Sequence, residues 1–294
     1  MGAIIKATGV STDPQLGSSI AHAAIAAKAC IANAGIAVEE IDMLINVGVY
    51  RDANMVEPAM AALVAKEIGL NLDYVKFPTK KAALSLDLMN GGCGMLNAIQ
   101  VASAFLTVDR GQTILIVSSD AHPSGRTNVP GFPYATMGAA MLLTHHASDG
   151  RGFGRLQVRD SNDGFIGRQG VLHEDGPTGR ERISVHTDEG YAERLVELAR
   201  DAVREYVVAE RLDLDKTLLV TSHVTPRFGA ALAAQLKVAD AATVRVDVGG
   251  DPHTSAMTLG YHLGEKSGQN GRFEQILFVS AGAGLTTACA IYRR

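Results

Sequence analysis

The chain has 294 residues, of which 47% are hydrophobic and 20% are charged, and its formal net charge is -4 at pH 7. This composition fits one large or two ordinary globular domains. The basic residues are scattered, which argues against a nucleic-acid-binding surface. We find no apolar run of membrane-spanning length and no signal peptide, so we expect no membrane association. Three distant cysteines cannot form a disulfide framework, and we predict a cytoplasmic location.

Helix-like and strand-like segments alternate through the first half. Residues 17–34 are Ala-rich with helical spacing, and Ser18 or Ser19 is placed to cap that helix. Apolar patterns predict further strands at 41–49, 83–89, 113–119 and 138–144, and helices at 56–69 and 92–108. Buried strands separated by helices indicate a parallel or mixed sheet covered on both faces. Residues 120–135 and 147–188 are rich in turn-forming residues and are predicted to be loops or insertions.

The second half repeats this order. Its predicted strands are 217–221, 243–248, 275–281 and 285–292, and its predicted helices are 189–210, 226–236 and 253–264. MLINVGV resembles LLVTSHV, LDLMNGGCGM resembles VDVGGDPHTS, and TILIVSS resembles QILFVSA. We therefore predict an internal duplication with halves at 1–150 and 151–294. Equivalent helix starts should meet near a pseudo-two-fold axis, which would place residues 92–93 close to His253.

Three short stretches follow strand-like runs and open predicted helices: 90–94, 222–226 and 251–255. They contribute one thiol, Cys93, and two imidazoles, His223 and His253. A helix N-terminus lowers the pKa of a thiol, and the thiolate is a strong nucleophile. A cysteine with two histidines is therefore a set of groups suited to covalent acyl transfer.

Four motifs resemble the ketoacyl-ACP synthase III family of the thiolase superfamily. Residues 282–288 are similar to its terminal glycine-rich strand, and 222–228 to its Pro-His-Gln-Ala-Asn-x-Arg segment. Residues 252–256 are similar to its Gly-Asn-Thr-Ser-Ala, and 86–88 begin its nucleophile segment. The similarity runs from about residue 18 to the C-terminus. It implies an α/β thiolase-like fold with five layers (αβαβα) and two duplicated halves, usually a homodimer.

The resemblance also implies a function. Such enzymes take an acyl group from coenzyme A or the phosphopantetheine of an acyl-carrier protein onto a cysteine, and then carry out a decarboxylative Claisen condensation. No cofactor is bound permanently. Position by position, His223 matches the family histidine, and His253 stands where the family has asparagine, although chain-elongating relatives use two histidines. Backbone N–H groups near Ala283 and at the nucleophile are expected to form the oxyanion hole.

The register of the thiol departs from the family. The family segment runs Asp, four residues, Cys, one residue, Gly. Counted from Asp87, this places Gly92 at the cysteine position and Cys93 one residue later. One residue on a helix is a rotation of about 100°, so catalysis by Cys93 requires a rearranged glycine turn. Otherwise Cys93 is an ordinary buried small residue, as we expect Cys30 and Cys289 to be.

Several functions remain open at this stage. The first is a ketoacyl synthase III-like enzyme that acts through Cys93, His223 and His253 on acyl-CoA or acyl-ACP. Another is a silent subunit, with Gly92 at the nucleophile position, that forms a heterodimer with an active ketosynthase homologue. A third is acyl transfer to an oxygen or nitrogen acceptor. Residues 120–135 are expected to shape the acyl pocket or a dimer contact. The remaining histidines lack ligand spacing, so we predict no metal site.

Overall fold

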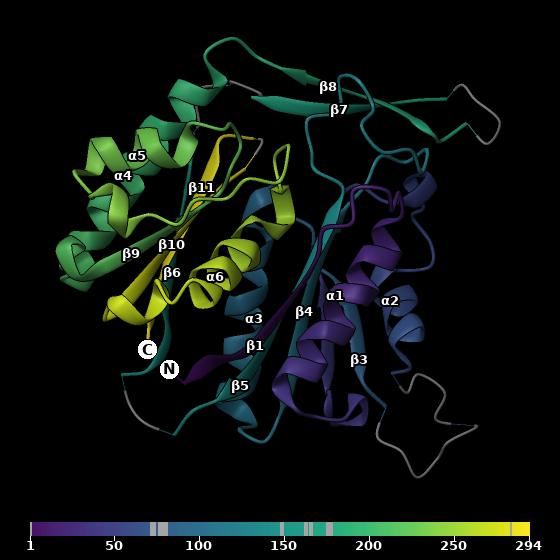
Figure 1. Cartoon of the computed structure of the whole chain (residues 1–294), viewed down its shortest axis with the longest axis horizontal. Coiled ribbons are helices and arrows are strands. Elements are labelled where there is room, and N and C mark those ends of the chain that lie inside the picture. Colours follow the sequence, from purple (N-terminus) through teal and green to yellow (C-terminus); the bar gives the residue numbers. More distant parts are fainter. Residues whose placement is uncertain are drawn as a thin grey trace.

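The computed structural model describes residues 2–70, 75, 82–147, 150–161, 164, 167–174, 179–282 and 284–294. Figure 1 shows five layers. Helices α1 and α2 cover one sheet on the outside, α4 and α5 cover the other, and α3 and α6 lie between the two sheets. The predicted five-layer α/β arrangement is therefore confirmed.

The first sheet has five strands in the order β1-β5-β4-β2-β3. Strands β2, β3 and β4 are parallel, and β5 is antiparallel to both β1 and β4. The elements of this half are β1 (Ala3–Ser11), α1 (Ser19–Ala34), β2 (Met43–Asn46), α2 (Met60–Ile68), β3 (Leu84–Asp87), α3 (Gly94–Val108), β4 (Thr113–Asp120) and β5 (Met137–His145). Ser18 caps α1, as expected, because its hydroxyl accepts the N–H of Ala21.

The second sheet repeats the topology in the order β6-β11-β10-β9, which corresponds to β1-β5-β4-β2. The elements are β6 (Gly152–Asp160), α4 (Tyr191–Glu210), β9 (Thr217–Thr221), α5 (Phe228–Leu236), α6 (Ala256–Lys266), β10 (Gln275–Gly282) and β11 (Thr286–Arg293). An antiparallel hairpin of β7 (Arg168–His173) and β8 (Arg182–Thr187) stands apart from both sheets. Short 3₁₀ turns occupy Val38–Glu40, Asp52–Asn54, Gly91–Cys93, Leu214–Lys216, Asp240–Ala242, His253–Ser255 and Asn270–Arg272.

Two predictions about strands were wrong. The region 147–188 is not merely loop, since it holds β6, β7 and β8. β7 and β8 are largely exposed and β6 is only partly buried, so these strands lack the apolar runs that mark a buried strand. Conversely, 243–248 forms no strand: one isolated bridge joins Thr243 to Leu219, and the segment then turns away to line a cavity. Strand β1 was not predicted from the sequence.

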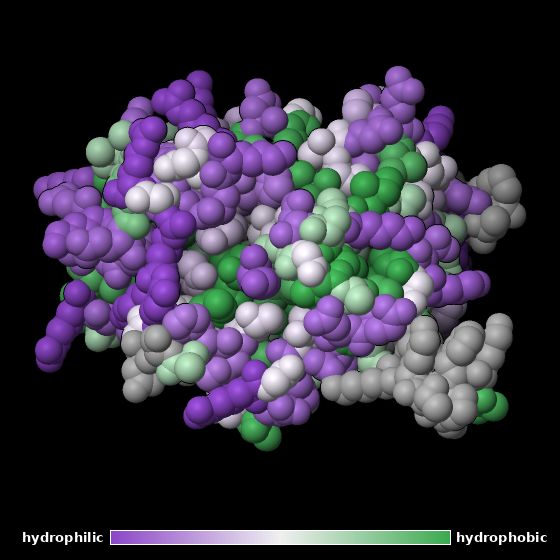
Figure 2. Space-filling view, turned by 60° about the horizontal axis from the view of Figure 1, so that its bottom comes forward, coloured by the Kyte–Doolittle hydropathy of each residue, from purple (hydrophilic) through white to green (hydrophobic). Residues whose placement is uncertain are grey.

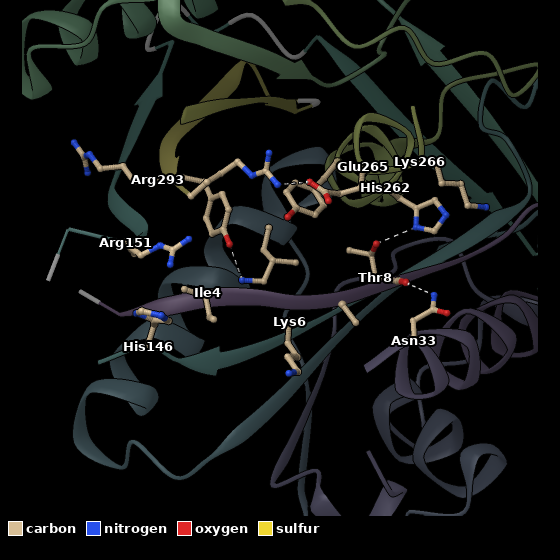
Figure 3. A pocket seen from close by; sticks show the side chains of 15 residues that line it. Ile4, Lys6, Thr8, Asn33, His146, Arg151, His262, Glu265, Lys266 and Arg293 are labelled. Carbon is tan, nitrogen blue, oxygen red and sulfur yellow. Dashed lines mark hydrogen bonds and ion pairs between the residues drawn. The ribbon is translucent and has the colours of Figure 1, made fainter. Parts of the chain in front are cut away.

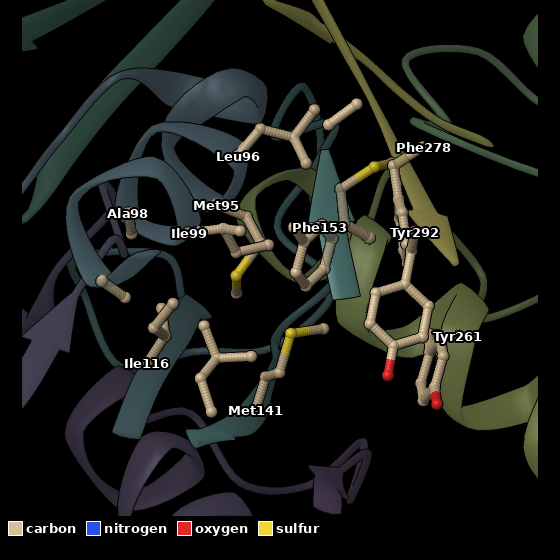
Figure 4. Packing of buried hydrophobic residues seen from close by; sticks show 14 of the residues in the cluster. Met95, Leu96, Ala98, Ile99, Ile116, Met141, Phe153, Tyr261, Phe278 and Tyr292 are labelled. Carbon is tan, nitrogen blue, oxygen red and sulfur yellow. The ribbon is translucent and has the colours of Figure 1, made fainter. Parts of the chain in front are cut away.

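The central layer packs against both sheets in one continuous core. Figure 4 shows Met95 and Ile99 of α3 among Ile116 and Met141 of the first sheet and Phe153 of the second. By length and composition the helical stretch Gly91–Val108 meets the criterion for a membrane span, contrary to our expectation that no stretch would. Its central position accounts for this apolar character, because 56% of it is buried inside the protein.

Large apolar side chains remain exposed in two places, on and just after the edge strand β3 and at the end of α3. Leu84 on β3 is 51% exposed, Met89 is 56% exposed, and Val108 at the end of α3 is 89% exposed. Apolar residues also show in the middle of the face turned forward in Figure 2, among polar ones.

Candidate active site

The three predicted site stretches come together at the N-terminal end of α3. A Cβ atom on Gly91 would lie 3.6 Å from His253 Nε2. A Cβ on Gly92 would lie 3.6 Å from the hydroxyl oxygen of Ser222, the residue before His223. The Gly91–Gly92 backbone therefore lies between the two histidine-bearing segments, as the duplicated architecture predicts.

The turns that begin α3 and α6 have the same backbone geometry. Gly91 has φ +48° and His253 has φ +47°, both in the left-handed region. Two residues later, Cys93 (φ -87°, ψ -12°) matches Ser255 (φ -87°, ψ -9°). The structural counterpart of His253 is thus Gly91. The sequence analysis was wrong to pair His253 with residues 92–93, because the segment from Asp247 to His253 is two residues longer than that from Asp87 to Gly91.

The side chain of Cys93 points toward β11, whereas it is Gly91 that faces His253. The Cys93 side chain is 1% exposed, and its sulfur is 3.7 Å from the carbonyl oxygen of Thr286 on β11. Burial raises the pKa of Cys93 to about 11, so the group is a thiol at neutral pH. In this conformation Cys93 has the surroundings of a packing residue and lacks those of an activated nucleophile.

Gly92 is held by close packing. A Cβ at this position would overlap with the carbonyl oxygen of Ala281 on β10. The position that the family register assigns to the nucleophile is therefore closed to any side chain in this structure. Asp87, at the start of the same motif, has a structural role: its carboxylate accepts the N–H groups of Met60 and Ala61 and caps α2. It also forms a 2.8 Å ion pair with Arg51.

His253 is buried and anchored by a carboxylate. Its Nδ1 lies 3.1 Å from the Oδ2 of Asp120, and the side chains are 8% and 1% exposed. The ring packs on Tyr134, with centroids 4.3 Å apart, and on Tyr50 at 5.6 Å. Its Nε2 faces Gly91, whereas the buried Nδ1 meets Asp120 as an ion pair and has no hydrogen-bond partner among the described residues.

Asp120 holds the surrounding backbone as well as the imidazole. It accepts the N–H groups of Val49 and Tyr50 and both the N–H and the hydroxyl of Thr254. Burial acts to raise the pKa of Asp120, but His253 and these donors outweigh it, and the pKa lies below its usual value. Burial acts to lower the pKa of His253, but the carboxylates of Asp120 and Asp251 outweigh it, and the pKa is raised.

Arg168 joins the two histidine segments, and the sequence analysis missed it. Its guanidinium lies 3.2 Å from Asp251 and donates to the carbonyl oxygen of Val224, next to His223. Asp251 in turn accepts the N–H of His253. Arg168 starts β7, within a region expected to be loop, and nothing local in the sequence marks it. Its burial among Tyr134 and Tyr191 depends on the tertiary fold.

His223 borders a cavity of about 820 Å³ lined also by Arg168, Thr225, Arg245, Gly250 and Asp251. Its Nδ1 is 3.1 Å from the carbonyl oxygen of Thr221, and since a carbonyl only accepts, Nδ1 carries the proton. Burial lowers the pKa of His223, so the neutral ring presents an unprotonated Nε2. The two imidazoles therefore differ, with His223 favouring the neutral form and His253 the charged form.

Two other predictions concern neighbouring parts of the site. Ala283, expected near the oxyanion hole, lies outside the described residues. The 120–135 loop lines a cavity of about 600 Å³ with Val129, Phe132 and Tyr134, next to the His253 ring. Among the described residues, no group of three His, Cys, Asp or Glu side chains is arranged to hold a metal.

A further cavity, of about 580 Å³, lies apart from the histidines, between β1 and the C-terminal end of α6. Figure 3 shows Lys6, Arg151 and Lys266 around it, with His262 bonded to Thr8. Ten residues of α6 separate Ala256, beside His253, from Lys266, which is about 15 Å at the rise of an α-helix. It shares His262 and Lys266 with the cavity beside the 120–135 loop, so the two cavities adjoin along α6.

Comparisons with known proteins agree with this architecture. No protein-family model matches the chain. A β-ketoacyl-[acyl-carrier-protein] synthase III of Rhodospirillum centenum is 25% identical in an alignment of 301 residues that covers 98% of this chain and 87% of the relative. The chain resembles the ketoacyl-ACP synthase III family to this extent.

Solved structures with the same fold include two 3-oxoacyl-(acyl carrier protein) synthases III. That from Pseudomonas aeruginosa has a TM-score of 0.78 at 17% identity and covers 100% of this chain and 98% of its own. That from Thermus thermophilus has a TM-score of 0.80 at 19% identity, with 99% of each chain covered. A variant of OleA from Xanthomonas campestris has a TM-score of 0.80 at 14% identity and covers 100% and 99%. These matches show the thiolase-like fold.

Proposed function

We propose that this protein is a ketoacyl synthase III-like acyltransferase that binds an acyl thioester, carried by coenzyme A or an acyl-carrier protein, and acts on its carbonyl group. The observation that carries the proposal is the meeting of both histidine segments at the Gly91–Gly92 turn at the start of α3. Helix-start N–H groups and two imidazoles with different protonation suit the stabilisation of a carbonyl oxygen that becomes negative.

The full form of this proposal is a decarboxylative Claisen condensation through an acyl group on Cys93. In that mechanism Cys93 would have to leave its packed position beside Thr286, and the two glycines before it supply the backbone freedom for such a change. His223 and His253 would then bind the thioester carbonyl of the extender. The cavity bordered by the 120–135 loop is the proposed site for the acyl chain.

Intact-mass measurement after incubation with octanoyl-CoA tests this form. An acyl adduct that maps to Cys93 and disappears in Cys93→Ser supports the acyl-cysteine enzyme. Formation of a 3-oxoacyl product on addition of malonyl-CoA or malonyl-ACP supports the condensation. If the protein neither binds an acyl thioester nor changes one, the proposed function is wrong.

A second function, that of a silent subunit, is favoured by one specific observation. The residue that faces His253 Nε2 is Gly91, which has no nucleophilic side chain. In this alternative the chain pairs with an active ketosynthase homologue, and the exposed side chains beside β3 are the proposed contact. Sedimentation of the protein alone and mixed with a ketosynthase from the same organism tests it. A stable homodimer that does not bind the ketosynthase would contradict this alternative.

A further inference from the structure

The position that faces the catalytic imidazole in this chain is residue 91, and it is occupied by glycine. Two features identify it: its backbone matches that of His253 on the opposite helix, and its Cα–H bond points at His253 Nε2. Apart from residues 90–92 and the backbone of the same helix, no other heavy atom of the described residues would lie within 4 Å of a Cβ placed there. The space next to Nε2 is therefore open on this side.

A water molecule hydrogen-bonded to Nε2 lies beside Gly91 and not directly between its Cα and the ring. A Cβ would stand 3.6 Å from Nε2, so the Cα is at most about 5.1 Å from that nitrogen, and a water oxygen about 2.9 Å from Nε2 fits only to the side of this line. Gly91 is only partly buried, so solvent can reach it. Neighbouring positions offer no competing nucleophile: Gly92 is closed by Ala281, and the Cys93 sulfur lies toward Thr286.

His253 has the geometry of a general base. The negative charge of Asp120, 3.1 Å from Nδ1, favours a proton on that nitrogen although the contact lacks hydrogen-bond geometry, and this leaves Nε2 as the acceptor in the neutral ring. The charged and titratable groups that face the ring from other elements are Asp120 from β4, Asp251 from the preceding loop, Arg168 from β7, and the hydroxyls of Tyr50 and Tyr134. Arg168 is paired with Asp251, so Asp120 is the carboxylate left for the imidazole.

The start of the α3 turn supplies hydrogen-bond donors. The N–H groups of Gly91 and Gly92 have no backbone partner among the described residues, as is usual in the first turn of a helix. Such groups stabilise a developing oxyanion.

We propose that this site hydrolyses acyl thioesters directly, with a water molecule beside Gly91 as the nucleophile and the His253–Asp120 pair as the general base. The water oxygen forms a bond to the thioester carbon while His253 Nε2 takes one of its protons. The tetrahedral intermediate then breaks the carbon–sulfur bond. His253 returns the proton to the leaving thiolate, so the products are a carboxylic acid and a free thiol, and no acyl-enzyme forms.

The protonation of His253 gives this proposal a characteristic pH dependence. Only the neutral ring accepts a proton, and its carboxylate neighbours hold the pKa above the usual value. Hydrolysis is therefore expected to rise with pH through a single pKa above that of an ordinary histidine, and to level off above it.

The inference rests on the proposed function, because it requires that an acyl thioester binds here. The test follows the hydrolysis of octanoyl-CoA by the whole protein, with octanoic acid measured by mass spectrometry and the protein by intact mass. We expect multiple turnovers without an acyl adduct. His253→Gln should lower kcat/KM by at least about 100-fold. His22→Gln, which removes a buried histidine from α1 that lines none of the cavities described above, serves as the control and should leave it unchanged.

Two substitutions at residue 91 probe the water directly. Gly91→Ala places a methyl group against the water and should abolish hydrolysis, whereas Gly69→Ala adds the same methyl at another positive-φ glycine away from the site. Gly91→Cys puts a thiol beside His253 and should produce the covalent acyl adduct that the wild-type protein lacks.

The outcomes separate the two proposals. An acyl adduct on Cys93 during turnover overturns the water mechanism and supports the acyl-cysteine enzyme. Binding of octanoyl-CoA without hydrolysis also overturns the water mechanism but leaves the proposed function standing. Absence of binding overturns both.

Discussion

The turns at Gly91–Cys93 and His253–Ser255 have nearly the same backbone angles, but only the second carries a side chain with acid–base chemistry at its first residue. The C-terminal turn carries an imidazole at its left-handed residue and is held by two buried carboxylates and Arg168. The N-terminal turn carries glycine at that residue and is held by the contact of Gly92 with Ala281. The repeated fold thus presents the same backbone position twice, with an imidazole in the C-terminal half and no side chain in the N-terminal half.

The difference also concerns how each turn is stabilised. A buried imidazole with positive φ carries backbone strain, and the surrounding network must overcome it. Asp120 does so by accepting four backbone and hydroxyl groups besides its pairing with His253. The glycine turn has no such strain and needs only close packing. The two turns should therefore respond differently to mutation.

The largest effect is expected from Asp120→Ala. It leaves buried N–H groups of Tyr50 and Thr254 and the His253 imidazole without their acceptor, and should lower the free energy of unfolding by about 3–5 kcal/mol. Urea denaturation measures the loss. Asp120→Asn, which keeps one oxygen acceptor, should retain part of the stability. An equal loss in both variants would contradict the idea that the acceptor network is what matters.

A smaller effect is expected in the other turn. Gly92→Ala forces a methyl group against the Ala281 carbonyl on a buried strand and should lower the free energy of unfolding by about 1–3 kcal/mol. Gly284→Ala, where a methyl group meets no atom within 4 Å, is the matched control and should change it by less than about 0.5 kcal/mol. If the Gly92→Ala protein were as stable as the control, the Ala281 carbonyl of β10 would have to shift without a measurable loss of stability.

The pH dependence of stability separates the two histidines. The pKa of His253 is raised in the folded protein, so its contribution is fully present below the unfolded value of about 6.5 and is lost as pH rises through the folded pKa. The pKa of His223 is lowered, so its contribution is present above that value and is lost as pH falls.

Urea denaturation at pH 6 and pH 9 of the wild type, His253→Gln and His223→Gln measures these contributions. The stability difference between wild type and His253→Gln should shrink at pH 9, and that for His223→Gln should not. Identical behaviour of the two variants would mean that the histidines share one environment.

The smallest effect is expected on thiol reactivity. With a pKa of about 11, Cys93 is ionised to about 0.1% at pH 8. Cys30 and Cys289, with pKa raised to about 12 by burial, are less ionised still. Ellman's reagent should therefore detect no fast thiol in the folded protein and three thiols in urea. Rapid labelling of Cys93 would show that the Gly91–Gly92 turn can change conformation and bring the thiol out of its packed position.

Much of the fold could be predicted because apolar periodicity and repeated motifs report on buried strands and helices. The exposed strands β6, β7 and β8 lack that signal. The register at Gly91 could not be predicted either, because a loop two residues longer in one half shifts the alignment there, and only backbone angles show the match.

The histidines were found from flanking motifs, and the structure places their segments on either side of the same glycine turn. Their catalytic roles remain predictions, as does that of Cys93. Asp120, Asp251 and Arg168 act through contacts between residues distant in sequence. Arg168 meets Asp251 across 83 positions of the chain, for example, so a linear pattern carries no trace of the pair.

The hydrophobic core between the two sheets is shared by both halves, and this affects how the protein unfolds. One hydrophobic cluster includes Met43 and Leu96 from the first half and Leu218 and Phe278 from the second, around helices that both sheets share. Neither half can bury its inner face without the other. Although the two sheets repeat one topology, we expect a single cooperative unfolding transition, in which the two halves melt together and neither folds when expressed alone.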